Sequence, residues 1–319
     1  MRRFAKPTVV VSKCLEFEAC RYNGDKITNA TICDLKPYVE FIPVCPEVEI
    51  GLSIPRETIR LVDKEGKNHL LQPSTGEDLT ESMSEFSEEF LNNVGSVDGF
   101  ILKSRSPTCG IKDARVYKGI EKGPTIGKAN GIFADHVMQQ FGGVAIEDEG
   151  RLNNFTIRER FFIKLFTLAE FRDVKQSQSI GQLERFHQKN YYLFKAFRSP
   201  LLQKLESLIK TYDQQGIFAE YEHYLKPMFQ RMARYDSNIN VCNEIVERFR
   251  TELSSNEYQF YQEMIEKYRQ KKIPFSSVQA ILKAWAVRFE DQWLLQQTYF
   301  EPYPESLLTI SDSGKGRDY

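Results

Sequence analysis

Long hydrophobic runs are absent from this sequence of 319 residues. No stretch approaches the run of about 20 apolar residues that a membrane-spanning helix needs. The N-terminal segment MRRFAKPTVVVSKC turns polar after a very short apolar run, which is unlike a signal peptide. We therefore expect a soluble, cytoplasmic protein that does not span a membrane.

An excess of charge of one sign is also absent. The chain has 43 lysines and arginines against 44 aspartates and glutamates, for a net charge of −1. This balance excludes a global field of the kind that attracts nucleic acids or anionic membranes without specificity. The sequence gives no strong nucleic-acid signal, so a nucleotide partner must be bound by local contacts. It leaves the oligomeric state open.

The length and a hydrophobic content of 41% predict two domains, each with a core of its own. In residues 1–150, short β-branched runs alternate with glycine and proline, which is typical of strands that lead into loops and helices. The segment 79–92 has apolar residues at helical spacing and Thr80 as a candidate N-cap. We predict an α/β domain with a mostly parallel sheet. The best strand candidates are residues 8–11, 39–44, 100–102 and 144–146.

Residues 151–319 contain few glycines, and their apolar residues recur at helical spacing, which predicts an all-α helical domain. Ser199-Pro200 is typical of a helix start, and Pro227 should end or kink its helix. Residues 311–319 are polar, and we expect a disordered tail. Helical patterns cover residues 183–194, 201–212, 217–235, 239–253, 258–269 and 277–295.

Cys14, Cys45 and Cys109 each follow one of the predicted strands of the first domain. Since ligands collect beyond the carboxyl ends of parallel strands, the three thiols are expected to converge on a metal site. A single cysteine is more often a small core residue, by roughly two to one. Zinc normally takes four cysteine or histidine ligands, and none of the four histidines lies beside a cysteine. An iron-sulfur cluster also takes thiolates, and with only three of them one iron keeps a free position.

Other polar residues surround these cysteines in the sequence. Glu47 could shuttle protons, although an exposed loop carboxylate is the commoner role. Ser106 has the turn backbone as its default partner. Cys20 is close enough to Cys14 to be a fourth ligand or a neighbour of the site. Cys33 and Cys242 are interpreted as core residues on helices.

At these residues the sequence resembles the thiouracil desulfidase (TudS-like) family. The motifs are SKCLEFEACRYNG at 12–24, PVCPEVEIGLSIPR at 43–56 and LKSRSPTCG at 102–110, with weaker support from GPTIGKANGIFA at 123–134. The helical half resembles the uncharacterised YbgA-like domain, which is often fused behind desulfidase domains. That match depends mostly on LERFHQKNYYLFKAF at 183–197.

The resemblance implies a 4Fe-4S cluster held by Cys14, Cys45 and Cys109, with Glu47 and Ser106 as catalytic residues. It implies an enzyme in which the open iron takes the sulfur of a thiouracil and water replaces it on the ring. The first motif departs from the family at residues 16–18, and Ile50 stands where glycine is common. These changes are expected to line the entrance of the site.

The expected substrate is a thiolated pyrimidine, in its 4-thio form, as the free base or as the nucleoside monophosphate. It would be released by tRNA degradation and enter nucleotide salvage. Lys103, Arg105 and the segment 123–131 are expected to meet its phosphate. The alternative is a non-enzymatic module that binds RNA or protein around a structural metal. The helical half has aromatic residues at helical spacing, but such residues are more often core than a platform on which bases stack.

Overall fold

The computed structural model describes residues 2–121, 123–211 and 216–309. The chain divides into two compact units, one of Met1–Ala169 with Ser306–Tyr319 and the other of Glu170–Glu305. Helix α5 (Phe155–Ser177) crosses this division along the chain. The predicted boundary at residue 150 stays a proposal. The predicted disorder of residues 311–319 falls outside the described residues.

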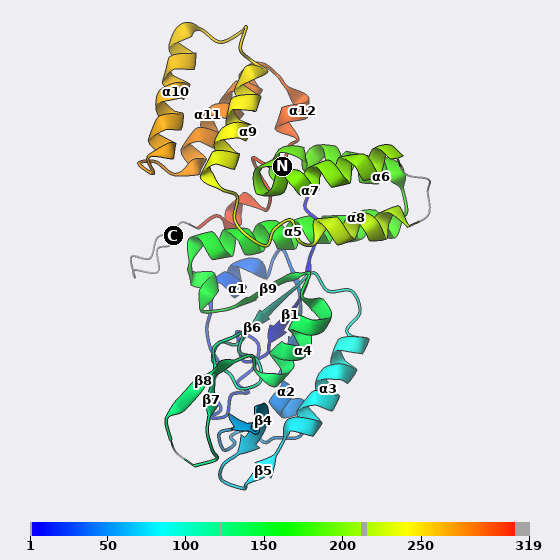
Figure 1. Ribbon diagram of the computed structural model, residues 1–319, viewed down its shortest axis with the longest axis vertical. Helices are drawn as coiled ribbons and strands as arrows, with labels where there is room; N and C mark the ends of the chain where they lie inside the picture. The colour runs from blue at the N-terminus through cyan, green and yellow to red at the C-terminus, as the bar shows by residue number, and fades with distance from the viewer. Residues whose placement is uncertain (1, 122, 212–215, 310–319) are drawn as a thin grey trace. The chain divides into compact units, whose positions relative to one another are not determined.

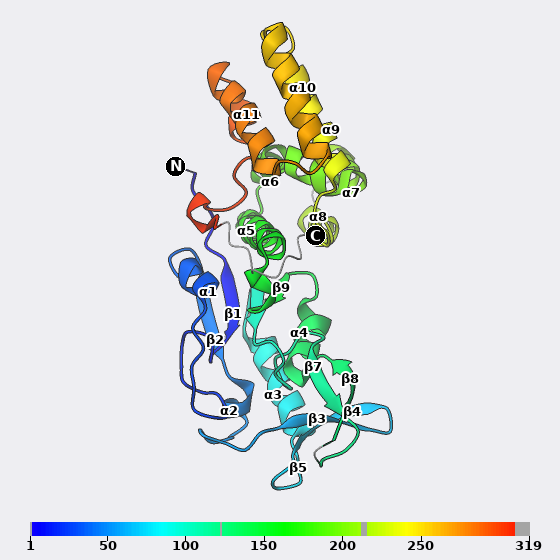
Figure 2. The same cartoon turned by 90° about the vertical axis from the view of Figure 1, so that its left-hand side faces the viewer.

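A parallel sheet with the strand order β2-β1-β6-β9 forms the centre of the first unit (Figures 1 and 2). Val9, Val10 and Val11 of β1 are fully buried because the strand lies between two neighbours inside the sheet. β-branched residues suit such a strand. The four predicted strands are confirmed to within two residues at either end. Their bounds are β1 (Thr8–Ser12), β2 (Glu40–Val44), β6 (Gly99–Leu102) and β9 (Ala145–Asp148).

Four helices connect these strands within the described part of the first unit. Buried residues of α3 and α4, among them Leu91 and Phe133, pack on Val10 and Phe100 of the sheet. The helix predicted at 79–92 is confirmed, but Thr80 is not its N-cap, because the helix begins at Thr80 itself. The bounds are α1 (Ala30–Leu35), α2 (Pro46–Glu49), α3 (Thr80–Asn93) and α4 (Ile132–Phe141).

A second sheet, which the sequence patterns did not predict, has the strand order β5-β4-β3-β7-β8 (Figure 2). Its pairs are antiparallel except for β3 with β7. Its strands interrupt the connections between the strands of the first sheet. The bounds are β3 (Arg60–Lys64), β4 (Lys67–Gln72), β5 (Glu77–Asp78), β7 (Ala114–Tyr117) and β8 (Thr125–Ala129).

The described residues of the second unit form helices, as predicted. Pro227 has the expected effect, since α8 ends at Leu225. The predicted start at Ser199-Pro200 appears as a kink, because Arg198 breaks the helical backbone inside α7 with φ −154° and ψ 81°. The bounds are α6 (Ile180–Lys189), α7 (Tyr191–Thr211), α8 (Ile217–Leu225), α9 (Tyr235–Glu247), α10 (Ser255–Arg269), α11 (Phe275–Arg288) and α12 (Gln292–Leu295).

The aromatic residues of the helical half are mostly core, as their spacing predicts. Phe161, Phe162, Tyr192 and Phe194 are all buried. Burial removes these four side chains from any platform on which bases could stack. Within residues 2–121, 123–211 and 216–309, no helix is both long and apolar enough to cross a bilayer.

Candidate active site

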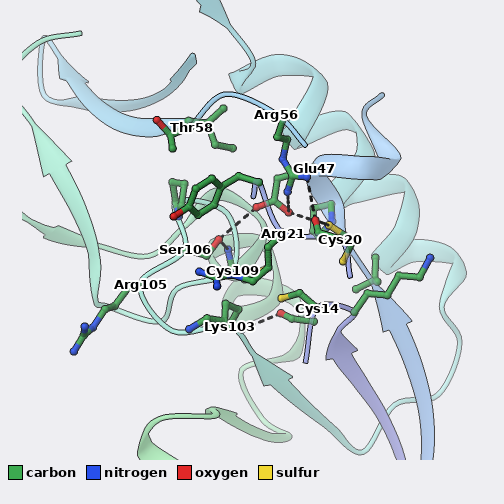
Figure 3. A pocket seen from close by; sticks show the side chains of 18 of the residues that line it. Cys14, Cys20, Arg21, Glu47, Arg56, Thr58, Lys103, Arg105, Ser106 and Cys109 are labelled. Carbon is green, nitrogen blue, oxygen red and sulfur yellow. Dashed lines mark hydrogen bonds and ion pairs between the residues drawn. The ribbon is translucent and has the colours of Figure 1, made fainter. Parts of the chain in front are cut away.

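A cavity of about 370 Å³ lies at the carboxyl ends of the parallel strands in the first unit (Figure 3). Its volume falls within the range of small-molecule sites. All five predicted site residues line it, namely Cys14, Cys45, Glu47, Ser106 and Cys109.

The strand order explains why the three thiols meet. Cys14 follows β1, Cys45 follows β2 directly, and Cys109 lies in the loop after β6. Since β2, β1 and β6 are adjacent and parallel, their carboxyl ends open onto the same edge of the sheet. The predicted convergence of the thiols is therefore confirmed, whereas their role as ligands stays a proposal.

Cys20 adds a fourth thiol to the cavity wall. Its side chain is fully buried. The pKa of Cys20 is raised to about 11, first by a hydrogen bond with the Cys14 side chain, while a hydrogen bond with Cys45 lowers it. The structure thus places Cys20 between two of the predicted ligands, as a neighbour of the site.

The environment of the thiols disfavours bare thiolates. The hydrogen bond with Cys20, burial and the charge of Glu47 all raise the pKa of Cys45. Burial and the charge of Glu47 raise the pKa of Cys109. A bound metal reverses this preference, because coordination deprotonates a thiol. In the part of the chain that the structure describes, no group of three or more His, Cys, Asp and Glu side chains is arranged around a single metal ion.

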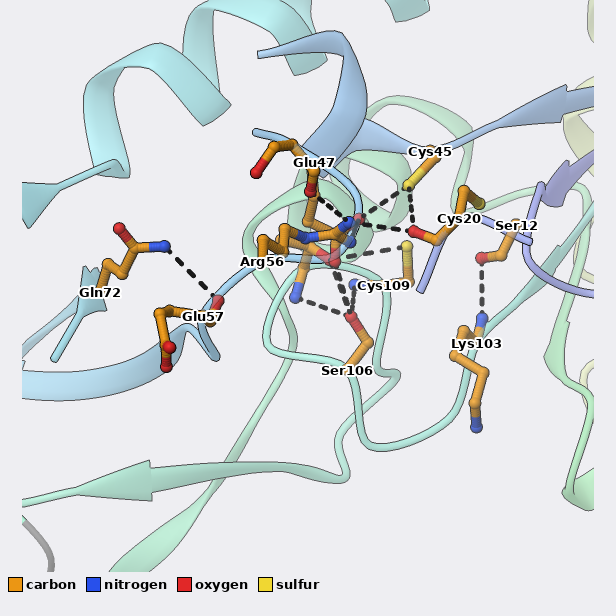
Figure 4. A network of polar contacts seen from close by, with 12 residues as sticks. Ser12, Cys20, Cys45, Glu47, Arg56, Glu57, Gln72, Lys103, Ser106 and Cys109 are labelled. Carbon is orange, nitrogen blue, oxygen red and sulfur yellow. Dashed lines mark hydrogen bonds and ion pairs between the residues drawn. The ribbon is translucent and has the colours of Figure 1, made fainter. Parts of the chain in front are cut away.

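Glu47 is held on every side by polar groups (Figure 4). It lies in the first turn of α2 with its side chain 13% exposed. Its Oε1 accepts a hydrogen bond from Thr108 Oγ1 at 2.5 Å and one from Ser106 Oγ at 3.5 Å. Its Oε2 lies 3.4 Å from Cys45 Sγ and 3.9 Å from Arg56 Nη2. This carboxylate is thus fixed beside a thiol, in a place where it could move protons.

Ser106 shapes the loop that presents Cys109. Its Oγ accepts hydrogen bonds from the backbone N–H groups of Thr108 and Cys109, both at 3.1 Å. The loop closes tightly at Gly110, where an added Cβ would come within 2.6 Å of the Ser106 carbonyl oxygen. The turn-binding role of Ser106 is therefore present, together with its contact to Glu47.

Two functional candidates were missed from the sequence. Thr108 is fully buried and donates to Glu47, although its motif singles out only the neighbouring serine and cysteine. Arg56 has a side chain only 6% exposed, and its Nη1 donates to the carbonyl oxygen of Cys20 at 3.0 Å. The signal for Arg56 was its place at the end of the second motif, PVCPEVEIGLSIPR.

The predicted phosphate site is not assembled by its three elements. Lys103 lines the cavity, but its Nζ forms an ion pair with Glu149 Oε1 at 2.5 Å. Arg105 is exposed, and its side chain points away from the other labelled residues in Figure 3. The segment 123–131 does not line the cavity, and it contains β8 (Thr125–Ala129).

Of the two cysteines that the sequence assigned to the core, one is buried and the other is exposed. Cys242 is buried on α9 as predicted, whereas Cys33 on α1 is exposed, so its assignment to the core is wrong. α1 is short, and Cys33 lies on its outer side. The family departures at Glu16, Phe17, Glu18 and Ile50 do not line the cavity, so the expectation that they form its entrance is also wrong.

Comparisons with known proteins found similar families and chains. Residues 9–149 match the family described as 2-thiouracil desulfurase, and residues 191–304 match a family described as a protein of unknown function, DUF1722. The uncharacterized protein YbbK of Bacillus subtilis (strain 168) is 30% identical over 153 residues, which cover 46% of this chain and 98% of YbbK. A solved structure described as the 4Fe-4S-dependent thiouracil desulfidase TudS is 25% identical, with coverage of 46% of this chain and 93% of that chain and a TM-score of 0.35. The resemblance seen in the motifs is confirmed, and the chain belongs to the 2-thiouracil desulfurase family.

Proposed function

We propose that the first unit is an iron-sulfur-dependent desulfidase that converts a thiouracil compound to the uracil compound. The observation that carries this proposal is the convergence of Cys14, Cys45 and Cys109 with the fixed carboxylate of Glu47 in one cavity. The family match supports the reaction, in which the ring C=S and water become C=O and hydrogen sulfide.

The donor set fits a 4Fe-4S cluster. Soft thiolates are the ligands that such clusters take, and a cluster needs its ligands farther apart than a single ion does. Cys14, Cys45 and Cys109 would hold it, which leaves one iron without a protein ligand. When bound, the cluster supplies a Lewis acid that accepts the negative charge developing on the sulfur of the substrate.

Glu47 is the proposed proton shuttle of the reaction. Its carboxylate takes a proton from the attacking water or returns one to the ring nitrogen. Thr108 and Ser106 hold Oε1 of this carboxylate, so its orientation is set before substrate arrives. Ser106 also orients the substrate, in keeping with its place on the cavity wall.

The proposed substrate is the 4-thiouracil unit from degraded tRNA, as free base or nucleoside monophosphate. The cavity volume of about 370 Å³ is of the size that such small molecules occupy. The role would be nucleotide salvage in the cytoplasm. The helical second unit carries no assigned activity in this proposal.

The test is anaerobic purification and reconstitution, followed by iron and sulfide analysis and an absorbance assay on 4-thiouracil and 4-thiouridine monophosphate. About four irons per chain and loss of the thiocarbonyl absorbance are expected. One zinc per chain, without visible absorbance or turnover, would instead support the binding module built around a structural metal.

A further inference from the structure

Five cationic side chains line the cavity, and their partners differ. A phosphate needs a cation that is free to exchange its present contacts for the ligand. The five are Lys13, Arg21, Arg56, Lys103 and Arg105.

Three of these cations are already engaged. Arg56 lies beside Glu47 and is buried, and Lys103 pairs with the largely buried carboxylate of Glu149. Lys13 pairs with Glu18 at 2.5 Å. Binding a phosphate at any of them would break a close ion pair or disturb the proposed proton shuttle.

Arg105 is unsuited to bind a phosphate in the cavity for a different reason. It is exposed and its side chain is directed away from the thiols (Figure 3). Its backbone N–H donates to both carboxylate oxygens of Asp113 at 2.9 Å, which fixes the backbone of the loop at this residue.

Of the five cations, Arg21 lies among the site residues and has an ion pair that a phosphate can displace. It follows Cys20 directly in the chain and lies among the site residues in Figure 3. Its described carboxylate partner is Asp25, at 3.9 Å and with a side chain 61% exposed. Ion pairs of this exposed kind contribute little, so a phosphate can displace one readily.

Tyr22 supports the guanidinium of Arg21. The guanidinium carbon lies 5.5 Å from the centre of the Tyr22 ring, within the range of a cation–π contact. Tyr22 itself lines the cavity and is 44% exposed. Such stacking orients the planar fork of Arg21, which binds phosphate oxygens in pairs.

We infer that Arg21 is the residue that recognises the phosphate of a nucleoside monophosphate substrate, held in place by Tyr22. The inference rests on the proposed function for the reaction that the substrate undergoes. Binding of the phosphate by Arg21 does not depend on that reaction. It replaces the phosphate site predicted from Lys103, Arg105 and residues 123–131.

The test compares kcat/KM for 4-thiouridine monophosphate and for free 4-thiouracil. The unmodified enzyme should favour the monophosphate by about tenfold or more, as expected for a charge-assisted contact. In Arg21→Ala the ratio of the two values should fall toward one, and Arg21→Lys should restore part of it. The matched control is Arg105→Ala, which removes an exposed arginine of the same cavity and should keep the ratio.

A second measurement does not need turnover. Uridine monophosphate should bind the unmodified protein in calorimetry, and its Kd should rise about tenfold or more in Arg21→Ala but not in Arg105→Ala. Equal ratios and equal Kd values in the unmodified protein and Arg21→Ala would overturn the inference. If no thiouracil compound is turned over at all, the proposed reaction fails, while the binding arm still decides the role of Arg21.

Discussion

Replacement of Thr108 by valine removes one hydroxyl from the site, and with it the contacts of that hydroxyl with Glu47, with Ser106 Oγ at 2.7 Å and with Cys109 Sγ at 3.8 Å. Thr108 is fully buried, and its Oγ1 donates to Glu47 Oε1 at 2.5 Å. Valine has nearly the same shape, so the loop between Ser106 and Cys109 should keep its path. A hydrogen bond to a charged group contributes about 1.5–3 kcal/mol. If this contribution is needed to orient Glu47 in the transition state, kcat falls roughly 10- to 150-fold, at about 1.4 kcal/mol per factor of ten.

The assay is the rate at which thiouracil absorbance disappears, with iron and sulfide content measured on the same samples. Thr108→Ser is the control, because it keeps the hydroxyl and should retain most of the activity. Cluster content should be equal in all three proteins. Full activity in Thr108→Val at unchanged iron content would refute the idea that this hydroxyl positions the carboxylate.

Three further perturbations test other parts of the structure. Replacing a proposed ligand, Cys14, Cys45 or Cys109, by serine should abolish the cluster. The same change at the exposed Cys33 or at the buried Cys242 should leave the cluster intact, and the iron content of each variant measures the outcome. Glu47→Gln should keep its iron but lose roughly a hundredfold to ten-thousandfold in turnover, and normal turnover would remove Glu47 from the mechanism. Burial lowers the pKa of His187 to about 4, so the unfolded chain binds the extra proton and the free energy of unfolding should fall by roughly 3 kcal/mol as the pH drops from 6.5 to 4. Urea unfolding should show that the loss of unfolding free energy at low pH is smaller in His187→Gln but unchanged in His223→Gln. The same pH dependence in both variants would contradict the role of His187.

The central sheet was predictable because its strands are buried and carry their own signal. Val9 to Val11 form an apolar run that is typical of a strand buried inside a sheet. The helices of the second half were predictable for a similar reason, since their apolar residues recur at the helical period. Their ends were less predictable. Asn190 ends α6, and the next helix begins at Tyr191 without a proline or glycine to mark the break.

The second sheet escaped because its strands are short and half exposed. β8 has the sequence TIGKA, and every residue of it before Ala129 is exposed, so no alternation of burial appears. A hairpin of this kind gains its stability from pairing with β7, which only tertiary structure reveals.

The residues that line the cavity were predictable, but their contacts were not. Cysteines that follow strands indicated the cavity, because strand order brings loop ends together. The roles of Thr108 and Arg56 depend on where α2 places Glu47, and no local pattern encodes that distance. The exposure of Cys33 likewise depends on which side of α1 meets the sheet.

The separation of the three thiols along the chain has a consequence for how the protein matures. Cys14, Cys45 and Cys109 belong to different segments, and only the pairing of β1 with both β2 and β6 brings those segments together. A motif with neighbouring cysteines can capture iron while the chain is still unfolded. Here the parallel sheet must form first, and contacts between distant segments form slowly. Loading of the proposed cluster would thus be a late event that acts on an already folded protein, and the bound cluster would then stabilise that fold by mass action.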